Sequence, residues 1–396
     1  MHRPILPQSQ ERLWYFAEAN SYFPSTFANN MQVMKMCAAF AAIGSKVTLV
    51  VPRRLATSRA IKQLKLSLWD YYAVPSNFEI AWLPFPYPFS ALQRSLHALA
   101  VAVYAITHRI RSAYTRSEWV ALALTQLGIS TVLELHHAYG GLDQILAARN
   151  ASKKAFLGVV CISQSLADEM ISLGFPADKV IVAPDGVDMH RFEPWLSKPE
   201  ARVLLGLPLD THIVCHAGHL YQGRGIETLL AAAAVLPETL FLFVGGNPED
   251  IACYQRRASE RFLNNVRFVG FVPNSKVPAY LYSADVLAMP YTHGTPTYRY
   301  MSPMKMFEYM AAGRAIVASD FPVLREVLRH EENALLYPPE DMTAFVNAIQ
   351  RLGDDPSLAQ RLGHQAWLDV KVYTWDRRAE RILVLTGRRL ESRPNT

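Results

Sequence analysis

The stretch IVCHAGHLYQGRGIETLLAAAAV occupies residues 213–235 and holds the features that decide the fold. It begins with a short apolar run typical of a buried strand, continues through a glycine-rich loop, and ends in a helical segment of alanine and leucine. A strand, a glycine turn and a helix in this order are typical of a βα unit in a parallel sheet. The stretch therefore predicts an α/β fold.

The same alternation of apolar runs and helical patterns extends along the rest of the chain. Strand-like runs precede the stretch at residues 13–17, 47–51, 78–83, 131–135, 158–162 and 180–182. Further runs follow it at residues 240–244, 266–269, 286–289, 316–318 and 334–337. We expect two consecutive doubly wound sheets, because each series supplies strands enough for one.

These series predict an N-terminal Rossmann-like domain at residues 1–183 and a second one at residues 200–372, with a proline-rich linker at 184–199. Ligands bind at the carboxyl ends of the strands in such sheets, so we expect the active site in a cleft where the two sheets face each other. The last helical segment, Trp375–Leu385, does not continue the second alternation. Residues 373–396 are therefore candidates to cross back to the first domain.

The composition excludes several classes of protein. Hydrophobic residues make up 51% and charged residues 19%, which excludes disorder and coiled coil. No apolar run is long enough to span a bilayer, and the N-terminus lacks the apolar core of a secretory signal. The four cysteines form no CxxC pair, so zinc sites and a disulfide framework are not expected. We expect a cytoplasmic protein.

Basic residues concentrate in residues 53–116, although the net charge of the chain is only +6. The only acidic residues in this range are Asp70 and Glu79. The basic residues are Arg53, Arg54, Arg59, Lys62, Lys65, Arg94, Arg109, Arg111 and Arg116. Such a patch favours an anionic partner, either a membrane surface or a phosphorylated acceptor. Nucleic acid is not expected, because no known binding signature accompanies the charge. Binding to a membrane would place the protein peripherally at its inner face.

Residues 89–111 repeat apolar side chains at helical spacing. The stripe consists of Phe89, Leu92, Leu96, Leu99, Val103, Ile106 and Ile110. Two interpretations are open. The segment is a helix packed on the protein's own sheet, which we favour, or one of its faces dips into a lipid interface beside the basic patch.

The loop at residues 218–225 is suited to bind phosphate. Its glycines let the backbone approach a phosphate closely, and the N-terminus of the following helix presents free N–H groups. Arg224 adds a cation whose donors match phosphate oxygens. The spacing resembles that of the Walker A motif. However, Arg224 stands in place of the motif's lysine, and Gly225 stands in place of the residue whose hydroxyl binds magnesium. A P-loop ATPase is therefore not expected.

A second motif, SPMKMFEYMAAG at residues 302–313, predicts a short helix capped by Ser302 with Pro303 in its first turn. Lys305 and Glu308 share one face of this helix. Lys305 can take an anionic diphosphate, while Glu308 can accept hydrogen bonds from a diol such as ribose. The alternative is a surface ion pair between them, which the apolar flanking residues argue against.

Together these motifs resemble the large retaining glycosyltransferase family 4, whose members have the GT-B fold of two Rossmann-like domains. The matching stretches are residues 161–168, 183–188, 218–225, 302–320 and 333–337. The resemblance implies a hexosyltransferase of the kind used in polysaccharide biosynthesis. It would move a sugar from a nucleotide-diphosphate sugar to an acceptor with retention at the anomeric carbon. No metal and no other cofactor are implied, because basic residues serve the diphosphate instead.

The resemblance also assigns roles to residues. Donor diphosphate binding falls to Gly218, His219, Arg224 and Lys305. Glu308 would bind the ribose, and it is a catalytic candidate together with His136, which lies near the transferred sugar on the strand face of Glu134. Sugar-side candidates are Tyr300, Met301 and Ser302. Acceptor-side candidates are Ser25, Thr26 and Asn29.

Some positions depart from the family pattern. Tyr300 stands where the family has the first of two glutamates, and His219 stands where a basic residue is usual. These departures keep a second hypothesis open, a catalytically reduced protein of GT-B fold that binds nucleotide-sugars or glycans. A sugar-nucleotide epimerase of the same fold is a third. The acceptor can be a glycan, a lipid-linked sugar or a small molecule.

Overall fold

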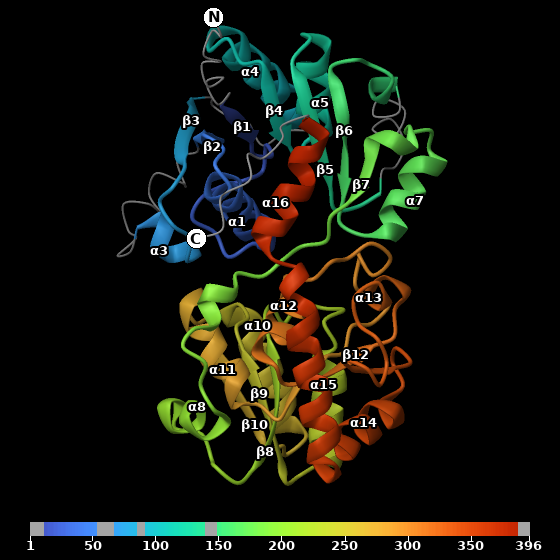
Figure 1. Ribbon diagram of the computed structural model, residues 1–396. Coiled ribbons are helices and arrows are strands. Elements are labelled where there is room, and N and C mark those ends of the chain that lie inside the picture. Colours follow the sequence, from blue (N-terminus) through green and yellow to red (C-terminus); the bar gives the residue numbers. More distant parts are fainter. Residues whose placement is uncertain (1–11, 54–66, 85–91, 139–148, 387–396) are drawn as a thin grey trace, which may run out of the picture. The chain divides into compact units, whose positions relative to one another are not determined.

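The computed structural model describes residues 12–53, 67–84, 92–138 and 149–386, which divide into two compact units (Figure 1). Unit 1 contains the described residues up to Ile162, Ala167–Ala183 and the C-terminal helix from Trp375 on. Unit 2 contains Ser163–Leu166 and Pro184–Thr374. No helix among these described residues is long and apolar enough to cross a membrane.

Unit 1 is built on a seven-stranded parallel sheet in the order β3-β2-β1-β4-β5-β6-β7. Its strands are β1 (Leu13–Phe16), β2 (Val47–Arg53), β3 (Glu79–Pro84), β4 (Ser112–Thr115), β5 (Ser130–Leu135), β6 (Phe156–Cys161) and β7 (Val180–Val182). Its described helices are α1 (Ala28–Ala42), α3 (Leu68–Tyr72), α4 (Gln93–Thr107), α5 (Glu118–Gln126), most of α7 (Gln164–Ser172) and α16 (Trp375–Leu383). The apolar pattern missed β4, because three of its four buried residues carry hydroxyl groups.

Unit 2 has a six-stranded parallel sheet in the order β10-β9-β8-β11-β12-β13. Its strands are β8 (His212–Ala217), β9 (Thr239–Val244), β10 (Val266–Gly270), β11 (Val286–Met289), β12 (Ala315–Ser319) and β13 (Leu335–Tyr337). Its described helices are α8 (Lys198–Leu205), α9 (Ile226–Val235), α10 (Pro248–Glu260), α11 (Val277–Ser283), α12 (Met304–Ala312), α13 (Pro322–Arg325), α14 (Met342–Asp354) and α15 (Pro356–Asp369). Both sheets follow the expected doubly wound layout.

The sheet of unit 2 is buried on both faces. Ile213 and Cys215 of β8 point into one hydrophobic cluster, whereas Val214 between them points into the other. Strand β11 repeats this alternation with Leu287 in the first cluster and Val286 in the second. Helices therefore cover both faces, which is why the strands of this unit are continuous apolar runs.

One segment differs from the expected domain boundaries. Residues 184–199 do not form a free linker but belong to unit 2, where Phe192 packs in the core and Val187 pairs with Thr374. Helix α16 belongs to unit 1 and packs beside α1 (Figure 1). The chain thus leaves unit 1 after Ala183 and returns to it at Trp375.

The interpretation that we favoured for residues 89–111, a helix packed on its own sheet, is confirmed, but most of the predicted stripe does not make the contact. Helix α4 does pack on the sheet of unit 1, but it does so with the small side chains Ala98, Val101 and Ala105. Four members of the predicted stripe turn away from this core, namely Leu92, Leu99, Val103 and Ile106, whereas Ile110 packs in it. Small residues occupy the inner face because they let the helix approach the sheet closely.

Candidate functional site

The polar groups of unit 2 gather where its strand order reverses. Strand β8 pairs with β9 on one side and with β11 on the other. From β8 the strand order continues outward through β9 and β10, and from β11 it continues in the opposite direction through β12 and β13. This reversal opens a crevice at the carboxyl ends of the strands. The loop after β8 is the predicted phosphate loop at 218–225, and the segment after β11 begins with Pro290 and Tyr291.

The glycines of this loop allow a close approach to the segment after β11. Gly225 has a φ of 76°, and a Cβ atom there would lie 1.7 Å from the carbonyl oxygen of Pro290. Gly223 has a φ of 87°, and its carbonyl oxygen accepts a hydrogen bond from the Thr295 hydroxyl at 2.6 Å. A side chain at either position would open this contact and displace the loop.

The start of helix α9 faces out of this loop without a cap. Gly225 takes the N-cap position in a left-handed conformation, and no side chain accepts a hydrogen bond from the first turn. The backbone N–H groups of that turn therefore retain their capacity to bind an anion, and the helix dipole adds to it.

Arg224 is held over two aromatic rings. Its guanidinium carbon lies 4.7 Å from the ring centre of Tyr221 and 5.1 Å from that of Tyr291, and it donates a hydrogen bond to the Tyr221 hydroxyl. Among the described residues, no carboxylate forms an ion pair with it. The ring of His219 lies beside that of Tyr221, with 5.4 Å between their centres.

Lys305 lies against the first glycine of the loop. A Cβ atom on Gly218 would be only 3.0 Å from the Lys305 Nζ atom, so the ammonium group abuts that backbone. Nζ is also 3.2 Å from His216 Nε2. Burial, reinforced by the nearby charge of Arg224, lowers the pKa of Lys305 well below its usual value. An anion bound here would supply the missing counter-charge.

His216, which our predictions did not include, determines how Lys305 is held. Its Nδ1 atom lies 3.1 Å from the carbonyl oxygen of Ala288 and donates to it, so Nε2 is the acceptor for Lys305. Burial, followed by the charge of Lys305, lowers the pKa of His216 well below its usual value. The ring is therefore a neutral acceptor at physiological pH.

Glu308 is bound by an arginine rather than by Lys305. Its Oε1 atom accepts a hydrogen bond from Arg191 Nη1 at 2.7 Å, and Arg191 Nη2 donates to the carbonyl oxygen of Asn274. The Arg191 side chain is 8% exposed and that of Glu308 is 19% exposed. Lys305 and Glu308 thus have separate partners. Arg191 was missed because it lies in the segment predicted to be a linker.

The three sugar-side candidates have different surroundings. The Met301 side chain is buried in the core of unit 2, so only its backbone can face a ligand. The Ser302 hydroxyl accepts a hydrogen bond from the Asp185 backbone N–H at 3.0 Å. The predicted cap is therefore wrong, since Pro303 takes the N-cap position of α12 and no side chain caps it. Tyr300 is half-buried, and Arg299 lies over its ring.

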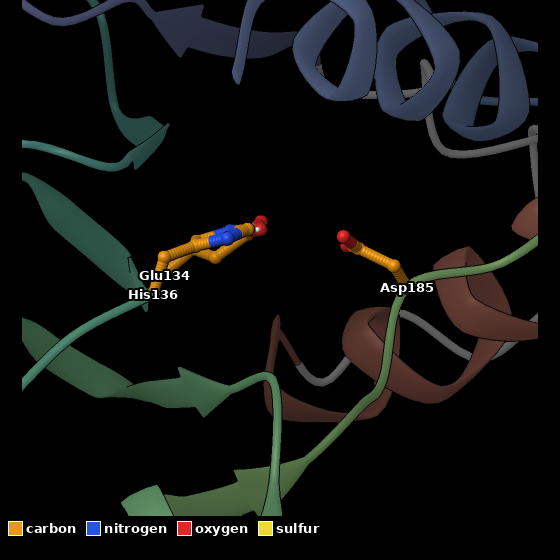
Figure 2. A group of neighbouring side chains, drawn as sticks. All are labelled: Glu134, His136 and Asp185. Carbon is orange, nitrogen blue, oxygen red and sulfur yellow. Dashed lines mark hydrogen bonds and ion pairs between the residues drawn. The ribbon is translucent and has the colours of Figure 1, made fainter. Parts of the chain in front are cut away.

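In unit 1, His136 directly follows β5 and lies beside Glu134, as Figure 2 shows. His136 Nε2 donates to Glu134 Oε1 at 2.6 Å, which leaves Nδ1 as the acceptor nitrogen. Burial, followed by the charge of Arg116, lowers the pKa of His136 to about 4. The imidazole is thus neutral near pH 7. Asp185, also drawn in Figure 2, belongs to unit 2.

Glu134 is an ionised carboxylate in the interior of unit 1. Burial opposes its ionisation, but Arg378 and the other donors outweigh this effect, so its pKa lies well below the usual value. Arg378 of α16 contributes two of the hydrogen bonds, at 2.9 and 3.4 Å, and Gln32 and Tyr114 donate as well. A metal ion would have to displace these donors to use Glu134 as a ligand.

The acceptor-side candidates divide into buried and accessible residues. Ser25 is 6% exposed, and its hydroxyl accepts a hydrogen bond from Asn30, so it serves the turn after β1. Thr26 is exposed, and Asn29 is half-buried at the start of α1, where its side chain accepts from the backbone of Asn30. Of these three, Thr26 and Asn29 remain accessible to a ligand of unit 1.

Several solved structures share this fold. Sucrose-phosphate synthase of Thermosynechococcus elongatus matches with a TM-score of 0.76 at 21% identity, over 95% of this chain and 98% of that one. HepE of Anabaena, solved with UDP-glucose, matches with a TM-score of 0.71 at 18% identity, over 95% and 99%. At these identities the comparison shows the fold, which is GT-B.

Relatives found by sequence similarity match only part of this chain. An uncharacterised glycosyltransferase of Methanocaldococcus jannaschii is 28% identical over 55% of this chain and 56% of its own length. A phosphatidyl-myo-inositol mannosyltransferase of Mycolicibacterium smegmatis is 30% identical over 52% and 50%. The matches span between 44% and 66% of the lengths of such relatives.

Two family models match this chain in succession. The model of glycosyltransferase family 4 matches residues 30–191, and that of glycosyl transferases group 1 matches residues 197–367. Together they cover most of both units, and they confirm the resemblance drawn from the motifs. The chain belongs to the GT-B glycosyltransferases of family 4.

Proposed function

We propose that the protein is a retaining glycosyltransferase that moves a sugar from a nucleotide-diphosphate sugar to an acceptor without a metal ion. The observation that supports this proposal is that two basic side chains, Arg224 and Lys305, lie together at the glycine loop. Both are cations, neither has a carboxylate partner among the described residues, and the uncapped N-terminus of α9 adjoins them. This arrangement suits a diphosphate.

The proposed reaction uses these cations to stabilise the leaving group. The bond between the anomeric carbon and the diphosphate oxygen breaks, and a bond to the acceptor oxygen forms on the same face of the sugar. The acceptor proton passes to the departing diphosphate. Arg224 and Lys305 are already in position when negative charge develops on that group, so they lower the barrier without reorganising. No metal is needed for this role.

We assign the ribose to Glu308 and the transferred sugar to the vicinity of His136. Arg191 holds Glu308 in one orientation, which leaves its second carboxylate oxygen to accept from a diol. His136 is neutral, and its Nδ1 atom can accept a hydrogen bond from a sugar hydroxyl. Tyr300 can take the place of the usual glutamate at the sugar with its own hydroxyl.

The acceptor is proposed to be a glycan or a lipid-linked sugar at the inner face of a membrane. The basic character of residues 53–116 supports this, because such a region attracts anionic lipid. A soluble small-molecule acceptor is the alternative, and it would give activity that vesicles do not enhance.

Turnover of a panel of UDP-, GDP- and ADP-sugars tests the proposal. We expect release of the nucleoside diphosphate from one of them, stimulated by acceptor and insensitive to a metal chelator. The Arg224→Ala variant should lose this activity, whereas Arg256→Gln on the exposed side of α10 should keep it. Binding without turnover would indicate a catalytically reduced protein instead, and formation of sugar isomers would indicate an epimerase.

A further inference from the structure

Helix α4 presents an apolar face to the surroundings. Four of its aliphatic side chains are exposed, namely Leu92 by 64%, Leu99 by 61%, Val103 by 53% and Ile106 by 58%. Spacings of seven, four and three residues place them on one side of the helix. The opposite side, formed by the buried residues Ala98, Val101 and Ala105, faces the sheet. We call the outer group of four the α4 face.

The α4 face is not an ordinary feature of a protein surface. Single exposed aliphatic residues are common and need no explanation, but a continuous row of them usually marks an interaction site. None of the described elements of unit 1 covers the row. Packing within the unit is already supplied by the inner face of the helix, so the outer face contributes nothing to that core.

The charges that flank the α4 face in the sequence are all positive. Between Glu79 and Glu118 the sequence contains no acidic residue. Arg94 lies exposed in the first turn of α4, and Arg109 and Arg111 lie exposed just after its last turn. Arg116 does not belong to this group, since it is turned inward and donates to Gln32 Oε1 at 2.9 Å. The apolar row therefore has cations at both of its ends.

We infer that α4 lies flat in the interface of an anionic membrane, with the α4 face in the acyl boundary and the flanking arginines on the headgroups. This inference deepens the membrane association proposed above and rests on it. Apolar insertion and attraction to anionic lipid reinforce each other on such a helix. A helix of 15 residues is too short to span the bilayer, which agrees with an orientation along its surface.

A second copy of the chain fits this surface less well. Two copies related by a two-fold axis would bring the α4 faces together and their arginines with them. Between Glu79 and Glu118 the sequence offers no acidic residue to balance those charges. Lipid headgroups supply the missing negative charge, which is why the charge pattern favours a membrane.

Flotation with vesicles tests the inference. We compare vesicles of phosphatidylcholine alone with vesicles that also contain phosphatidylglycerol, using the full chain. The apolar variant is Leu99→Asn/Val103→Thr/Ile106→Gln, and its control is Val203→Thr/Leu204→Gln on the exposed side of α8. The charge variant is Arg109→Gln/Arg111→Gln, and its control is Lys154→Gln/Arg256→Gln, which removes equal charge elsewhere.

We expect the wild type to float with the anionic vesicles and to be released by salt. The apolar variant should lose about a hundredfold in partitioning, and the charge variant should lose about tenfold or more. Both controls should behave like the wild type. Nucleoside diphosphate binding, measured on each preparation, should stay unchanged, because the altered side chains lie on α4 and not at the glycine loop.

Each other outcome overturns a separate part of the argument. If the wild type does not float, membrane association itself is wrong. If it floats but the apolar variant floats equally well, the protein binds membranes through other residues and α4 is not the inserted element. A dimer in sedimentation equilibrium that the apolar variant abolishes, without any flotation, would assign the α4 face to a second copy. None of these results bears on donor turnover, which tests the transferase independently.

Discussion

The Nζ atom of Lys305 lies 3.2 Å from Nε2 of His216, whose other ring nitrogen lies 3.1 Å from the carbonyl oxygen of Ala288. His216 on β8 thus fixes the side-chain orientation of Lys305 on α12 across the crevice. The backbone acceptor determines the histidine tautomer, and the tautomer presents a lone pair to the ammonium group. Lys305 is held in place before any diphosphate arrives.

His216 is accordingly predicted to be a positioning residue for the donor. His216→Leu removes the acceptor of the Lys305 ammonium group, a hydrogen bond to a charged group worth about 1.5–3 kcal/mol. We expect KM for the donor to rise about tenfold or more, with a smaller change in kcat. His216→Gln, which keeps an acceptor near the Nε2 position, should restore much of the affinity. Equal KM values for both variants would leave His216 with a packing role only.

Arg224 is predicted to recognise the diphosphate and not the nucleoside. We expect Arg224→Ala to weaken binding of the nucleoside diphosphate by about tenfold to a hundredfold, because charge-assisted hydrogen bonds are lost. Binding of the nucleoside alone should change little. Isothermal titration of both ligands measures this difference, with Arg256→Gln as the control. Equal losses for the two ligands would contradict the assignment of Arg224.

Glu308 is predicted to be required for activity but not for folding. Glu308→Ala should abolish turnover, since the ribose loses its acceptor, while circular dichroism still reports a folded protein at the assay temperature. The variant leaves Arg191 without its carboxylate, a cost of about 1–3 kcal/mol. Arg191→Met should raise KM for the donor less severely, because it frees Glu308 without removing it. Unchanged turnover of Glu308→Ala would refute its role.

The glycine loop shows how much of the site local sequence can predict. Helix α9 begins at Ile226 and ends at Val235, as expected, because the glycine before it and its run of leucine and alanine are encoded within a few residues. Other contacts of the site are not local. Arg191 and Glu308 are 117 positions apart, and only the fold of unit 2 brings them together. No periodicity or spacing signals such a pair.

Helix α4 shows where pattern reasoning chooses the wrong face. The periodicity of residues 89–111 predicts the helix correctly, but it ranks faces by hydrophobicity and so assigns the larger aliphatic residues to the core. In the structure Val101 and its alanine neighbours pack inward. Close approach of a helix to a sheet favours small side chains, and a hydrophobicity scale does not include this steric requirement.

The stability of the protein is predicted to fall between pH 7 and pH 5 partly through His136. Its pKa is about 4 in the folded protein and near 6.5 when unfolded. Above pH 6.5 both states are neutral there. Below it the unfolded chain binds a proton that the folded protein refuses, so stability falls until about pH 4. The thermal midpoint of His136→Gln should decline less over this range.

His137→Gln is the matched control for that measurement. His137 is the adjacent residue, but its side chain is 61% exposed. Its replacement should leave the slope of the thermal midpoint against pH as it is in the wild type. The range above pH 5 also avoids the titration of Glu134, whose pKa is depressed and whose contribution is lost only at lower pH. Identical slopes for both variants would contradict a buried, neutral His136.

The C-terminal helix is predicted to stabilise unit 1 through one buried ion pair. Arg378 is 2% and Glu134 0% exposed at the side chain, and they lie 2.9 Å apart. Arg378→Met leaves Glu134 as an uncompensated buried charge, which costs about 3–5 kcal/mol and should lower the melting temperature by about 10 °C. The double variant Glu134→Gln/Arg378→Met should be less destabilised than the sum of the single variants, because neither charge then remains alone. Additive losses would mean that the pair carries no coupling and that α16 is held by its apolar contacts.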